Sequence, residues 1–327
     1  MHSTPSLPTH FSDQWILAQR PRKNPVDQTR PYAFLVEKER AADGRIDDVA
    51  TIFLTNRECP FRCLMCDLWK NTTDDPVAPG AIPTQIRWAL EQLPPAQHVK
   101  LYNSGNFFDP NAIPEDNYVD IAEEVAAFRT VIVESHPRMI GRRCWGFQEM
   151  VNGELEVAMG LETAHPGVLA RLNKRMTLAD FERSTDALRK RGVPVRAFIL
   201  LRPPFLTEEE GVLWAKRSLD FAFNIGVQCC AIIPTRAGNG AMEVLAEHHQ
   251  FMPPTLESLE DVLDYGISLG LGRVFADLWD VEKLAENIPG GPARVERLRR
   301  MNLSQTIELR IPIECAHPSS GGGPRQS

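Results

Sequence analysis

Short apolar runs rich in β-branched residues alternate with helical patterns from about residue 49 to residue 277. This alternation is typical of βα units, whose strands pair in parallel and whose helices pack on the sheet. Two of the runs, 198–201 and 229–233, are almost continuously apolar, as expected for parallel strands that are buried on both faces. The pattern therefore predicts an α/β fold built on a parallel sheet.

At least six strands are predicted, and a seventh follows further along the chain. The predicted strands are 49–55, 98–103, 130–134, 155–162, 195–201 and 227–233, with the seventh at 273–277. Helices are expected between them, because Thr177-x-x-Asp180 and Thr207-x-x-Glu210 resemble capping boxes that begin a helix.

The chain of 327 residues is 43% hydrophobic, which is enough to form a full core. We expect an N-terminal extension over 1–45, with a short helix and a strand, before a βα core over 46–280. A C-terminal extension over 281–327 is expected to end in a disordered tail, since 319–327 is rich in Gly, Ser and Pro.

The net charge of −7 argues against an extended surface for non-specific nucleic-acid binding. An arginine run could still form a local basic patch, although a solvated helix face is the preferred interpretation. The run consists of Arg294, Arg297, Arg299 and Arg300. The first thirty residues show neither a signal peptide nor a membrane span, and seven cysteines suit a reducing compartment, so a cytoplasmic location is expected.

Three cysteines, Cys59, Cys63 and Cys66, lie within eight residues directly after the first predicted strand. Three thiolates can ligate three irons of a cubane cluster and leave the fourth iron free to bind a small molecule. A zinc site is the alternative, but its nearest further ligands, His98 and Cys144, are distant in the sequence. The loop therefore predicts an iron–sulfur centre with an open iron.

The other cysteines and a histidine pair do not extend this centre. The remaining cysteines, which have no Cys-x-x-Cys spacing, are Cys144, Cys229, Cys230 and Cys315. Cys229 and Cys230 fall within a predicted strand and are interpreted as small buried hydrophobic residues. His248 and His249 are adjacent, so on a helix they point about 100° apart and are interpreted as surface residues.

The spacing Cys-x3-Cys-x2-Cys after a first strand resembles the cluster motif of the radical S-adenosylmethionine (SAM) superfamily. The resemblance implies a partial (β/α)6 TIM-like barrel that binds a [4Fe-4S] cluster and S-adenosyl-L-methionine. It implies an enzyme whose open iron chelates SAM and whose reductive cleavage of SAM yields a 5′-deoxyadenosyl radical that abstracts hydrogen from a substrate. An external one-electron donor such as flavodoxin or ferredoxin is implied as a partner.

The resemblance also implies cofactor contacts at the carboxyl ends of the strands. Ser104, Gly105 and Asn106 stand in the place of the family's glycine-rich motif, which meets the methionine amino group; Asn106 replaces the usual acidic residue. Glu134 and Glu162 end the third and fourth predicted strands, and they are expected to contact the ribose and the methionine moiety. Solvated strand-end acids are the alternative for both.

Further contacts are implied by the same resemblance. Lys174 stands where the family carries a cation for the cofactor carboxylate, with Arg175 as the alternative cation and a basic helix end as the structural alternative. Met65 replaces an aromatic residue before the third cysteine and can pack against adenine. Arg202 and Arg236 follow the fifth and sixth predicted strands. Their place after these strands, and not the resemblance, makes both of them substrate candidates, because an arginine there suits an anionic or planar partner; a clamp on a neighbouring loop is the alternative. Arg202 is expected to be the catalytic residue.

The strings 102–110, 134–137 and 160–162 most resemble the elongator/methylthiotransferase/NifB-type core. Within it they resemble the radical subunit of archaeosine synthase, which acts on a lysine-bearing deazaguanine in tRNA. The acidic chain carries no evident RNA-binding module, so a small molecule or a peptide stays an alternative to a tRNA substrate. A non-catalytic iron–sulfur or zinc protein for sensing or assembly is the hypothesis from another class; it predicts the cysteine loop without a cofactor pocket.

Overall fold

The computed structural model describes residues 7–311, whose strands form one sheet in the order β1-β2-β3-β4-β5-β6-β7-β8. Only β1 and β2 pair antiparallel, and every later pair is parallel. The strands are β1 (Ala33–Arg40), β2 (Ile46–Phe53), β3 (His98–Tyr102), β4 (Thr130–Ser135), β5 (Glu154–Glu162), β6 (Val195–Leu201), β7 (Cys229–Pro234) and β8 (Arg273–Ala276).

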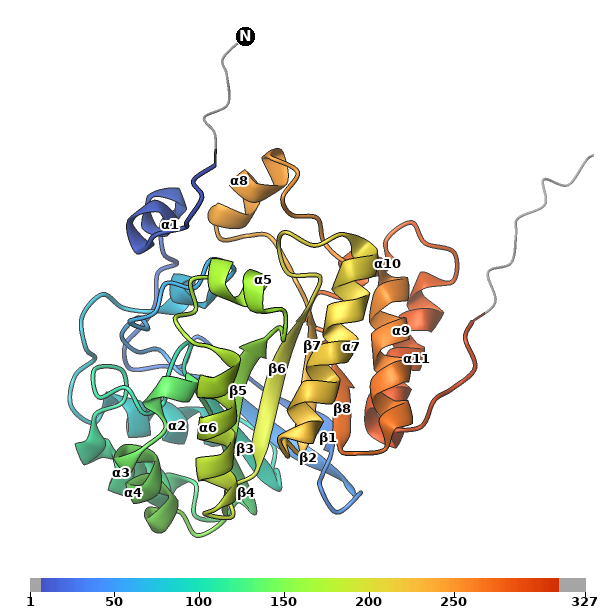
Figure 1. Cartoon of the computed structure of the whole chain (residues 1–327). Helices are drawn as coiled ribbons and strands as arrows, with labels where there is room; N and C mark the ends of the chain where they lie inside the picture. The colour runs from blue at the N-terminus through green and yellow to red at the C-terminus, as the bar shows by residue number, and fades with distance from the viewer. Residues whose placement is uncertain (1–6, 312–327) are drawn as a thin grey trace, which may run out of the picture.

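Most of the helices lie between parallel strands and cover the outer face of the curled sheet (Figure 1). The α-helices are α1 (Asp13–Gln19), α2 (Ala81–Leu90), α3 (Tyr118–Glu124), α4 (Arg142–Met150), α5 (Pro166–Arg171), α6 (Leu178–Arg189), α7 (Glu208–Asn224), α8 (Ala241–Glu247), α9 (Leu256–Leu269), α10 (Glu282–Ala285) and α11 (Gly291–Ser304). Helical turns η1 (Leu68–Asn71), η2 (Glu115–Asn117) and η3 (Pro137–Met139) complete the set in the described residues. Both expected capping boxes are formed, at the starts of α6 and α7.

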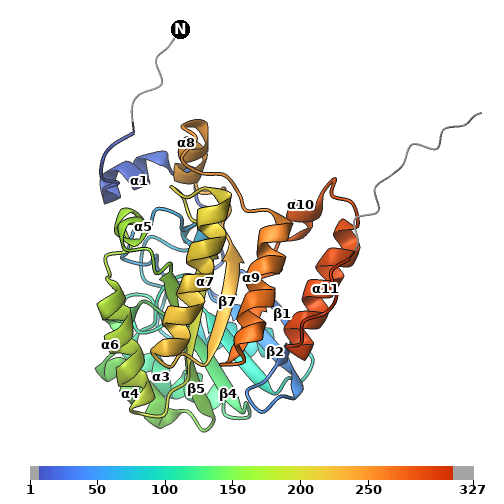
Figure 2. The same ribbon diagram turned by 45° about the vertical axis from the view of Figure 1, so that its right-hand side comes forward.

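The main apolar core lies between the sheet and its helices. Alternate strand residues such as Ile52, Leu101 and Ile199 point to this outer side and are fully buried in one cluster with the helices. Helices α6, α7, α9 and α11 stand in a row over this face (Figure 2). The strand residues that alternate with Ile52, Leu101 and Ile199 therefore face the inside of the curl.

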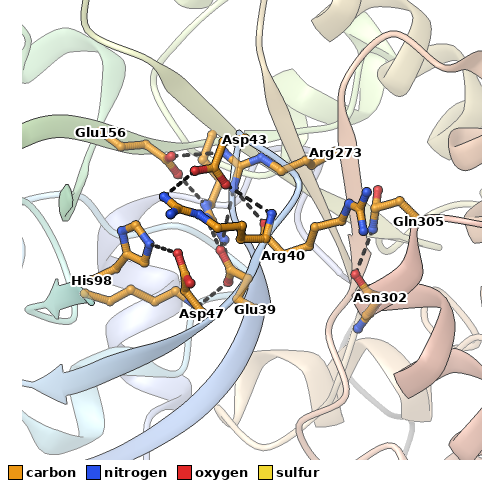
Figure 3. Close-up of polar contacts among 12 residues, drawn as sticks. Glu39, Arg40, Asp43, Asp47, His98, Glu156, Arg273, Asn302 and Gln305 are labelled. Atoms are coloured by element: carbon orange, nitrogen blue, oxygen red, sulfur yellow. Dashed lines mark hydrogen bonds and ion pairs between the residues drawn. The ribbon is translucent and has the colours of Figure 1, made fainter. Parts of the chain in front are cut away.

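A network of buried charges, here called the ionic floor, crosses the inside of the curl toward the amino ends of the parallel strands. Lys100 Nζ lies 2.6 Å from Glu39 Oε2, and Arg196 Nη2 lies 2.6 Å from Glu39 Oε1. Arg196 Nε also lies 2.7 Å from Glu156 Oε1, whose other oxygen is 3.2 Å from Arg273 Nη2. Burial favours a neutral Glu39, but Arg196 and Lys100 outweigh it and hold the pKa of that carboxyl well below its usual range. The floor joins strands from both edges of the sheet (Figure 3).

The open edge of β8 is covered by side-chain amides instead of another strand. Gln305 accepts a hydrogen bond from the N–H of Val274 at 2.7 Å and donates to its carbonyl at 2.8 Å. Asn302 makes the same two contacts with Ala276, each at 2.9 Å. Figure 3 shows both amides beside the floor. These contacts satisfy backbone groups that an unpaired edge strand would leave exposed.

The predicted α/β partial barrel is confirmed, and β6 has the predicted bounds. The expected seventh strand is β8, and the strand of the N-terminal extension joins the sheet as β1. The domain boundaries at residues 45 and 280 stay a prediction. The expected disordered tail and Cys315 lie outside the described residues. No helix within residues 7–311 combines the length and the apolar character that a membrane span needs.

Both interpretations of the arginine run are wrong for two of its members. Arg294 and Arg297 expose 7% and 0% of their surface, because α11 packs them against acidic residues of α9. Arg294 Nη2 lies 2.6 Å from Glu260 Oε2, and Arg297 Nη2 lies 2.7 Å from Asp264 Oδ1. The spacing of the arginines in the sequence of α11 does not indicate the acidic residues of α9 with which they pair. Only the last two arginines of the run form an exposed face.

We expect Arg297→Ala to lower the free energy of unfolding by about 3–5 kcal/mol, because it removes a fully buried cation that pairs with Asp264 and donates to the carbonyl of Glu308. Arg300→Ala is the matched control, since that arginine is half exposed on the same helix and should hardly affect stability. Urea unfolding of the two variants and the wild-type chain measures the difference. Equal losses of unfolding free energy in Arg297→Ala and Arg300→Ala would contradict the burial of Arg297.

Candidate functional site

The cysteine loop, residues 58–66, lies at the carboxyl ends of the parallel strands, near α1, α5 and α8 (Figure 1). Leu64 is fully buried in a small apolar cluster with Ile16 of α1 and Leu245 of α8. Its backbone N–H also donates to the carbonyl of Leu172 at 2.9 Å. The loop is therefore fixed by elements that are distant from it in the sequence.

Side-chain N–H groups bind the carbonyls of this loop. Asn239 donates to Leu64 O at 2.8 Å and to Cys66 O at 3.1 Å, and Asn173 donates to Arg62 O at 2.7 Å. The Trp69 indole also donates to Cys66 O, at 3.0 Å. Sequence reasoning missed these supports. The sequence signal is local: Asn239 lies in a Gly-Asn-Gly run, and asparagine is one of the few residue types that adopt a left-handed backbone, as Asn173 does with a φ of 51°.

Positive charge surrounds the start of the loop. Glu58 accepts ion pairs from Arg20 at 2.6 Å, Lys23 at 2.8 Å and Arg62 at 3.1 Å. Burial favours a neutral Glu58, but Lys23 and Arg20 outweigh it and lower the pKa of the carboxyl. Three cations around one carboxylate leave a local positive excess. Such an excess favours negatively charged sulfur in the loop.

The three cysteines themselves are partly buried. Burial raises the pKa of Cys59, Cys63 and Cys66 to about 12, while the charge of Lys174 acts in the opposite direction on the first two. Asn106 Nδ2 donates to the sulfur of Cys59 at 3.1 Å. Thiolates at such a place need a bound cation, and an all-sulfur donor set suits iron–sulfur chemistry.

Residues 7–311 contain no group of three His, Cys, Asp or Glu side chains that could hold a single metal ion. This finding does not bear on a cubane cluster, because each of its thiolates binds a different iron. The residues present therefore fit the cluster that the motif predicts.

The loop 103–106 after β3 approaches the cysteine loop closely. A Cβ at Gly105 would lie 2.9 Å from the Cβ of Cys59, so only glycine fits there. Glu134 accepts the N–H groups of Asn103 at 2.7 Å and Gly105 at 3.1 Å. The Ser104 hydroxyl lies 2.9 Å from the hydroxyl of Tyr32. The structure therefore brings the predicted Ser-Gly-Asn motif and Glu134 together beside the cysteines.

His136 is a further positioning residue that sequence reasoning missed. Its ring stacks on Phe61 of the cysteine loop with centroids 3.8 Å apart. Its Nδ1 accepts the N–H of Arg138, so Nε2 donates to the carbonyl of Lys174 at 2.8 Å. Its backbone N–H donates to the side chain of Asn106. Burial lowers the pKa of His136 to about 3, so the ring is neutral at ordinary pH.

Glu162 and Lys174 form a buried ion pair above the end of β5. Each exposes 7% of its surface, and Lys174 Nζ contacts Glu162 Oε1. A Cβ at Gly160 would overlap both groups, so glycine makes room for the pair. Burial lowers the pKa of Lys174, but Glu162 and then Cys63 outweigh it and raise the pKa overall. Arg175, the alternative cation, instead pairs with Asp13 of α1.

The other predicted contacts have structural partners. Met65 packs, partly buried, against the apolar clusters around Leu64 and Leu172. Arg202 pairs with Glu208 at the start of α7 and donates to the carbonyl of Pro253 at 2.8 Å. These are the contacts of a loop clamp, the alternative interpretation of Arg202, and its catalytic role stays a prediction.

Arg236 and the histidine pair lie outside this group of contacts. Arg236 donates to the carbonyl of Trp279 at 2.6 Å. Cys229 and Cys230 are fully buried, as predicted. His249 is exposed, whereas His248 is only partly exposed and contacts Val244 O at 2.8 Å.

Known proteins resemble this chain at low sequence identity. No family model matches the chain. An uncharacterized protein of Methanocaldococcus jannaschii is 23% identical over 311 residues, covering 88% of this chain and 85% of the relative. The archaeosine synthase subunit beta of Thermococcus kodakarensis is 29% identical over 219 residues, covering 62% of this chain. That match spans 65% of the relative, which is less than two thirds of its length.

Two solved structures overlap with part of this chain. The archaeal Elp3 of Methanocaldococcus infernus has a TM-score of 0.49 at 14% identity and covers 67% of this chain and 59% of that one. Coproporphyrinogen III oxidase from Escherichia coli, described as a radical SAM enzyme, has a TM-score of 0.43 at 14% identity and covers 79% of this chain and 56% of that one. In sequence, the chain thus resembles archaeosine synthase subunit beta, as expected.

Burial raises the pKa of Glu134 to about 7, although the N–H groups of residues 103–105 oppose this shift. The unfolded chain releases the same proton near the ordinary value of 4.5, so the unfolding free energy should fall as the pH rises from 4.5 to about 7. We expect Glu134→Gln to remove this contribution while its amide oxygen still accepts the loop N–H groups. Urea unfolding at pH 4.5 and at pH 7 measures this contribution to the unfolding free energy. An equal change of unfolding free energy with pH in the variant and the wild type would contradict the raised pKa of Glu134.

Proposed function

We propose that this chain is a radical SAM enzyme that binds a [4Fe-4S] cluster through Cys59, Cys63 and Cys66 and cleaves S-adenosyl-L-methionine reductively. The observation that carries the proposal is the meeting of three features at one rim. The partly buried thiols lie beside the glycine loop 104–106, and a buried carboxylate–ammonium pair, Glu162 and Lys174, couples electrostatically to Cys63. A loop that only stored a metal would not need the second and third features.

The protein's own groups would bind and orient the cofactor. Lys174 would bind the SAM carboxylate, and Glu162, relieved of part of its ion pair, would accept the amino group. The fully buried amide of Asn103 has no hydrogen-bond partner for either of its side-chain atoms within residues 7–311, so it offers one donor and one acceptor. When bound, the cluster and SAM would supply the electron and the carbon radical that the protein's residues cannot supply.

The relative named archaeosine synthase subunit beta supports a finer proposal, that the substrate is a tRNA nucleoside. A small molecule or a peptide is the other substrate class. The electron would come from an external donor such as flavodoxin or ferredoxin. The competing hypothesis is that the chain is a non-catalytic iron–sulfur or zinc protein for sensing or assembly. The next experiment distinguishes such a protein from the enzyme.

After anaerobic reconstitution we expect about four iron and four sulfide per chain and formation of 5′-deoxyadenosine from SAM with dithionite. Replacement of any one of Cys59, Cys63 and Cys66 by Ala should abolish 5′-deoxyadenosine formation, because each thiolate holds a different iron. Cys230→Ala, which alters a buried cysteine on the outer face of β7, is the control and should keep cluster and activity. Stoichiometric zinc without iron would contradict the proposal, and an iron–sulfur cluster without cleavage of SAM would favour the sensor.

We expect Lys174→Met and Glu162→Gln each to weaken SAM binding by about 1–3 kcal/mol, the cost of losing a hydrogen bond to a charged group. Arg175→Met is the matched control, because that cation is half exposed and pairs with Asp13. Equilibrium dialysis of SAM against the reconstituted variants measures the affinities, and iron content verifies the cluster. Weakening by Arg175→Met alone would move the carboxylate contact to Arg175.

A further inference from the structure

Unpaired positive charge gathers around the cysteine loop. Among the lysines and arginines that the structure describes, only four make no hydrogen bond or ion pair to an oxygen: Arg22, Arg57, Arg171 and Arg217. Arg57 directly precedes the loop, Arg22 lies in the segment that pairs with Glu58, and Arg171 ends α5, whose next residue binds the loop backbone. In a chain of net charge −7, this gathering favours a negatively charged partner at the loop.

A hollow of about 330 Å³ lies against the cysteine loop and is lined by Arg57. Pro60 and Arg62 of the loop also line it, and Asp109 and Asn111 come from the segment that follows β3. None of the three cysteines and none of residues 103–106 belongs to this lining. The hollow is therefore separate from the proposed contacts of SAM.

The carboxylates of the hollow already have partners, whereas one of its cations has none. Glu58 has its three ion pairs, and Asp74 lies 2.7 Å from Lys23 Nζ. The buried Asp109 accepts a backbone N–H at 3.0 Å. The guanidinium of Arg57 has no such partner within residues 7–311, although a β-bridge to residue 73 fixes its backbone. A carboxylate that enters the hollow would therefore find an unpaired cation and break no existing ion pair.

Cys59 connects the hollow with the loop 103–106. Its two neighbours in the chain, Glu58 and Pro60, line the hollow. Its sulfur accepts a hydrogen bond from Asn106 at 3.1 Å, and its Cβ lies where a side chain on Gly105 would be. A protein seated in the hollow would therefore come close to a cluster bound at Cys59 and would leave the loop 103–106 uncovered.

A protein fits this hollow better than a nucleic acid does. One unpaired cation can pair with one carboxylate side chain, whereas a nucleic-acid backbone carries a negative charge on every nucleotide. Asp74 lines the hollow, Asp75 follows it in the chain, and both are exposed, so they would repel such a backbone. Pro60 and Asn111 are exposed as well, so uncharged groups surround Arg57. A polar, solvent-accessible lining of this kind is typical of the rim of a protein interface.

We propose that the hollow is the docking surface for an acidic protein that carries one electron, and that a carboxylate of this carrier pairs with Arg57. This proposal rests on the proposed function, because it assigns the place at which the required electron enters. The carrier holds a flavin or an iron–sulfur group. It is oxidised by one electron, and the cluster of this chain is reduced by the same electron.

The first experiment measures binding of oxidised flavodoxin of net negative charge to the full-length reconstituted protein by isothermal titration calorimetry. We expect Arg57→Glu to raise the Kd about tenfold and Arg57→Gln to raise it less, because the first variant adds repulsion to the lost ion pair. Raised salt should weaken binding and reduce the difference between the variants. Arg217→Glu is the matched control, since Arg217 also lacks a carboxylate partner but stacks on Trp214 of the outer helix α7.

The second experiment compares two reductants in the formation of 5′-deoxyadenosine. With reduced flavodoxin at a concentration below its Kd, we expect Arg57→Glu to slow product formation about tenfold, in step with the loss of affinity. With dithionite the rate should equal that of the wild-type protein, because a small reductant needs no docking surface. Iron content and thermal unfolding confirm that each variant holds its cluster and is folded.

Flavodoxin binding that Arg57→Glu weakens and Arg217→Glu leaves unchanged supports the proposal. Binding that Arg57→Glu leaves unchanged, equal weakening by both variants, or no flavodoxin binding by the wild-type protein overturns it. Binding of a tRNA transcript instead of flavodoxin, weakened by Arg57→Glu, also overturns it and makes the hollow a nucleic-acid surface. If the wild-type protein forms no 5′-deoxyadenosine with dithionite, the proposed function fails, and the calorimetric measurement still decides on the docking surface.

Discussion

Glu39 links distant parts of the curled sheet, because it pairs with cations on strands that are not neighbours of β1 in the sheet. Its two oxygens contact Lys100 of β3 and Arg196 of β6, and it lies 3.8 Å from Arg273 of β8. A buried charge network is stable only if every member is paired, so removal of one partner leaves an uncompensated charge in the interior. Glu39 therefore ties the β1 edge of the sheet to strands on the other side of the curl. This link makes the N-terminal hairpin part of the barrel and closes its amino end.

The ionic floor also determines what can lie above it. Charged side chains fill the amino end of the inner face, so the next residues along the strands, Tyr102 and Phe198, form a separate aromatic layer. The residues of the candidate site follow in a third layer, where Glu134 fixes the loop that carries Gly105. The charge of Glu134 still contributes to raising the pKa of Tyr102, together with burial and Glu39, so the three layers are electrostatically connected.

Local sequence patterns predicted those features whose causes are local. The strand 195–201 is a continuous apolar run, and the capping box at Thr207 needs only four residues, so both could be found without tertiary information. The three cysteines were likewise grouped by spacing alone. Arg297 could not be placed in this way, because its burial depends on Asp264 of another helix. Asn173 and His136 were missed for the same reason, since their partners lie in the cysteine loop or after a different strand.

Five of the ten positive φ angles at non-glycine residues within 7–311 lie at the carboxyl-end rim of the sheet. Ser104 has a φ of 55°, Glu162 of 64°, Asn173 of 51°, Arg175 of 58° and Arg202 of 53°. Each follows or ends a strand, or lies in the turn after α5, and a left-handed backbone costs free energy at every such position. Surrounding contacts maintain it: the buried ion pair holds Glu162, and two amide hydrogen bonds hold Asn173. At the four positions other than Asn173, a fold that needed only stability would relax the turn with glycine or asparagine. Backbone strain that surrounding contacts maintain is typical of functional sites, and this observation does not depend on the cysteine motif.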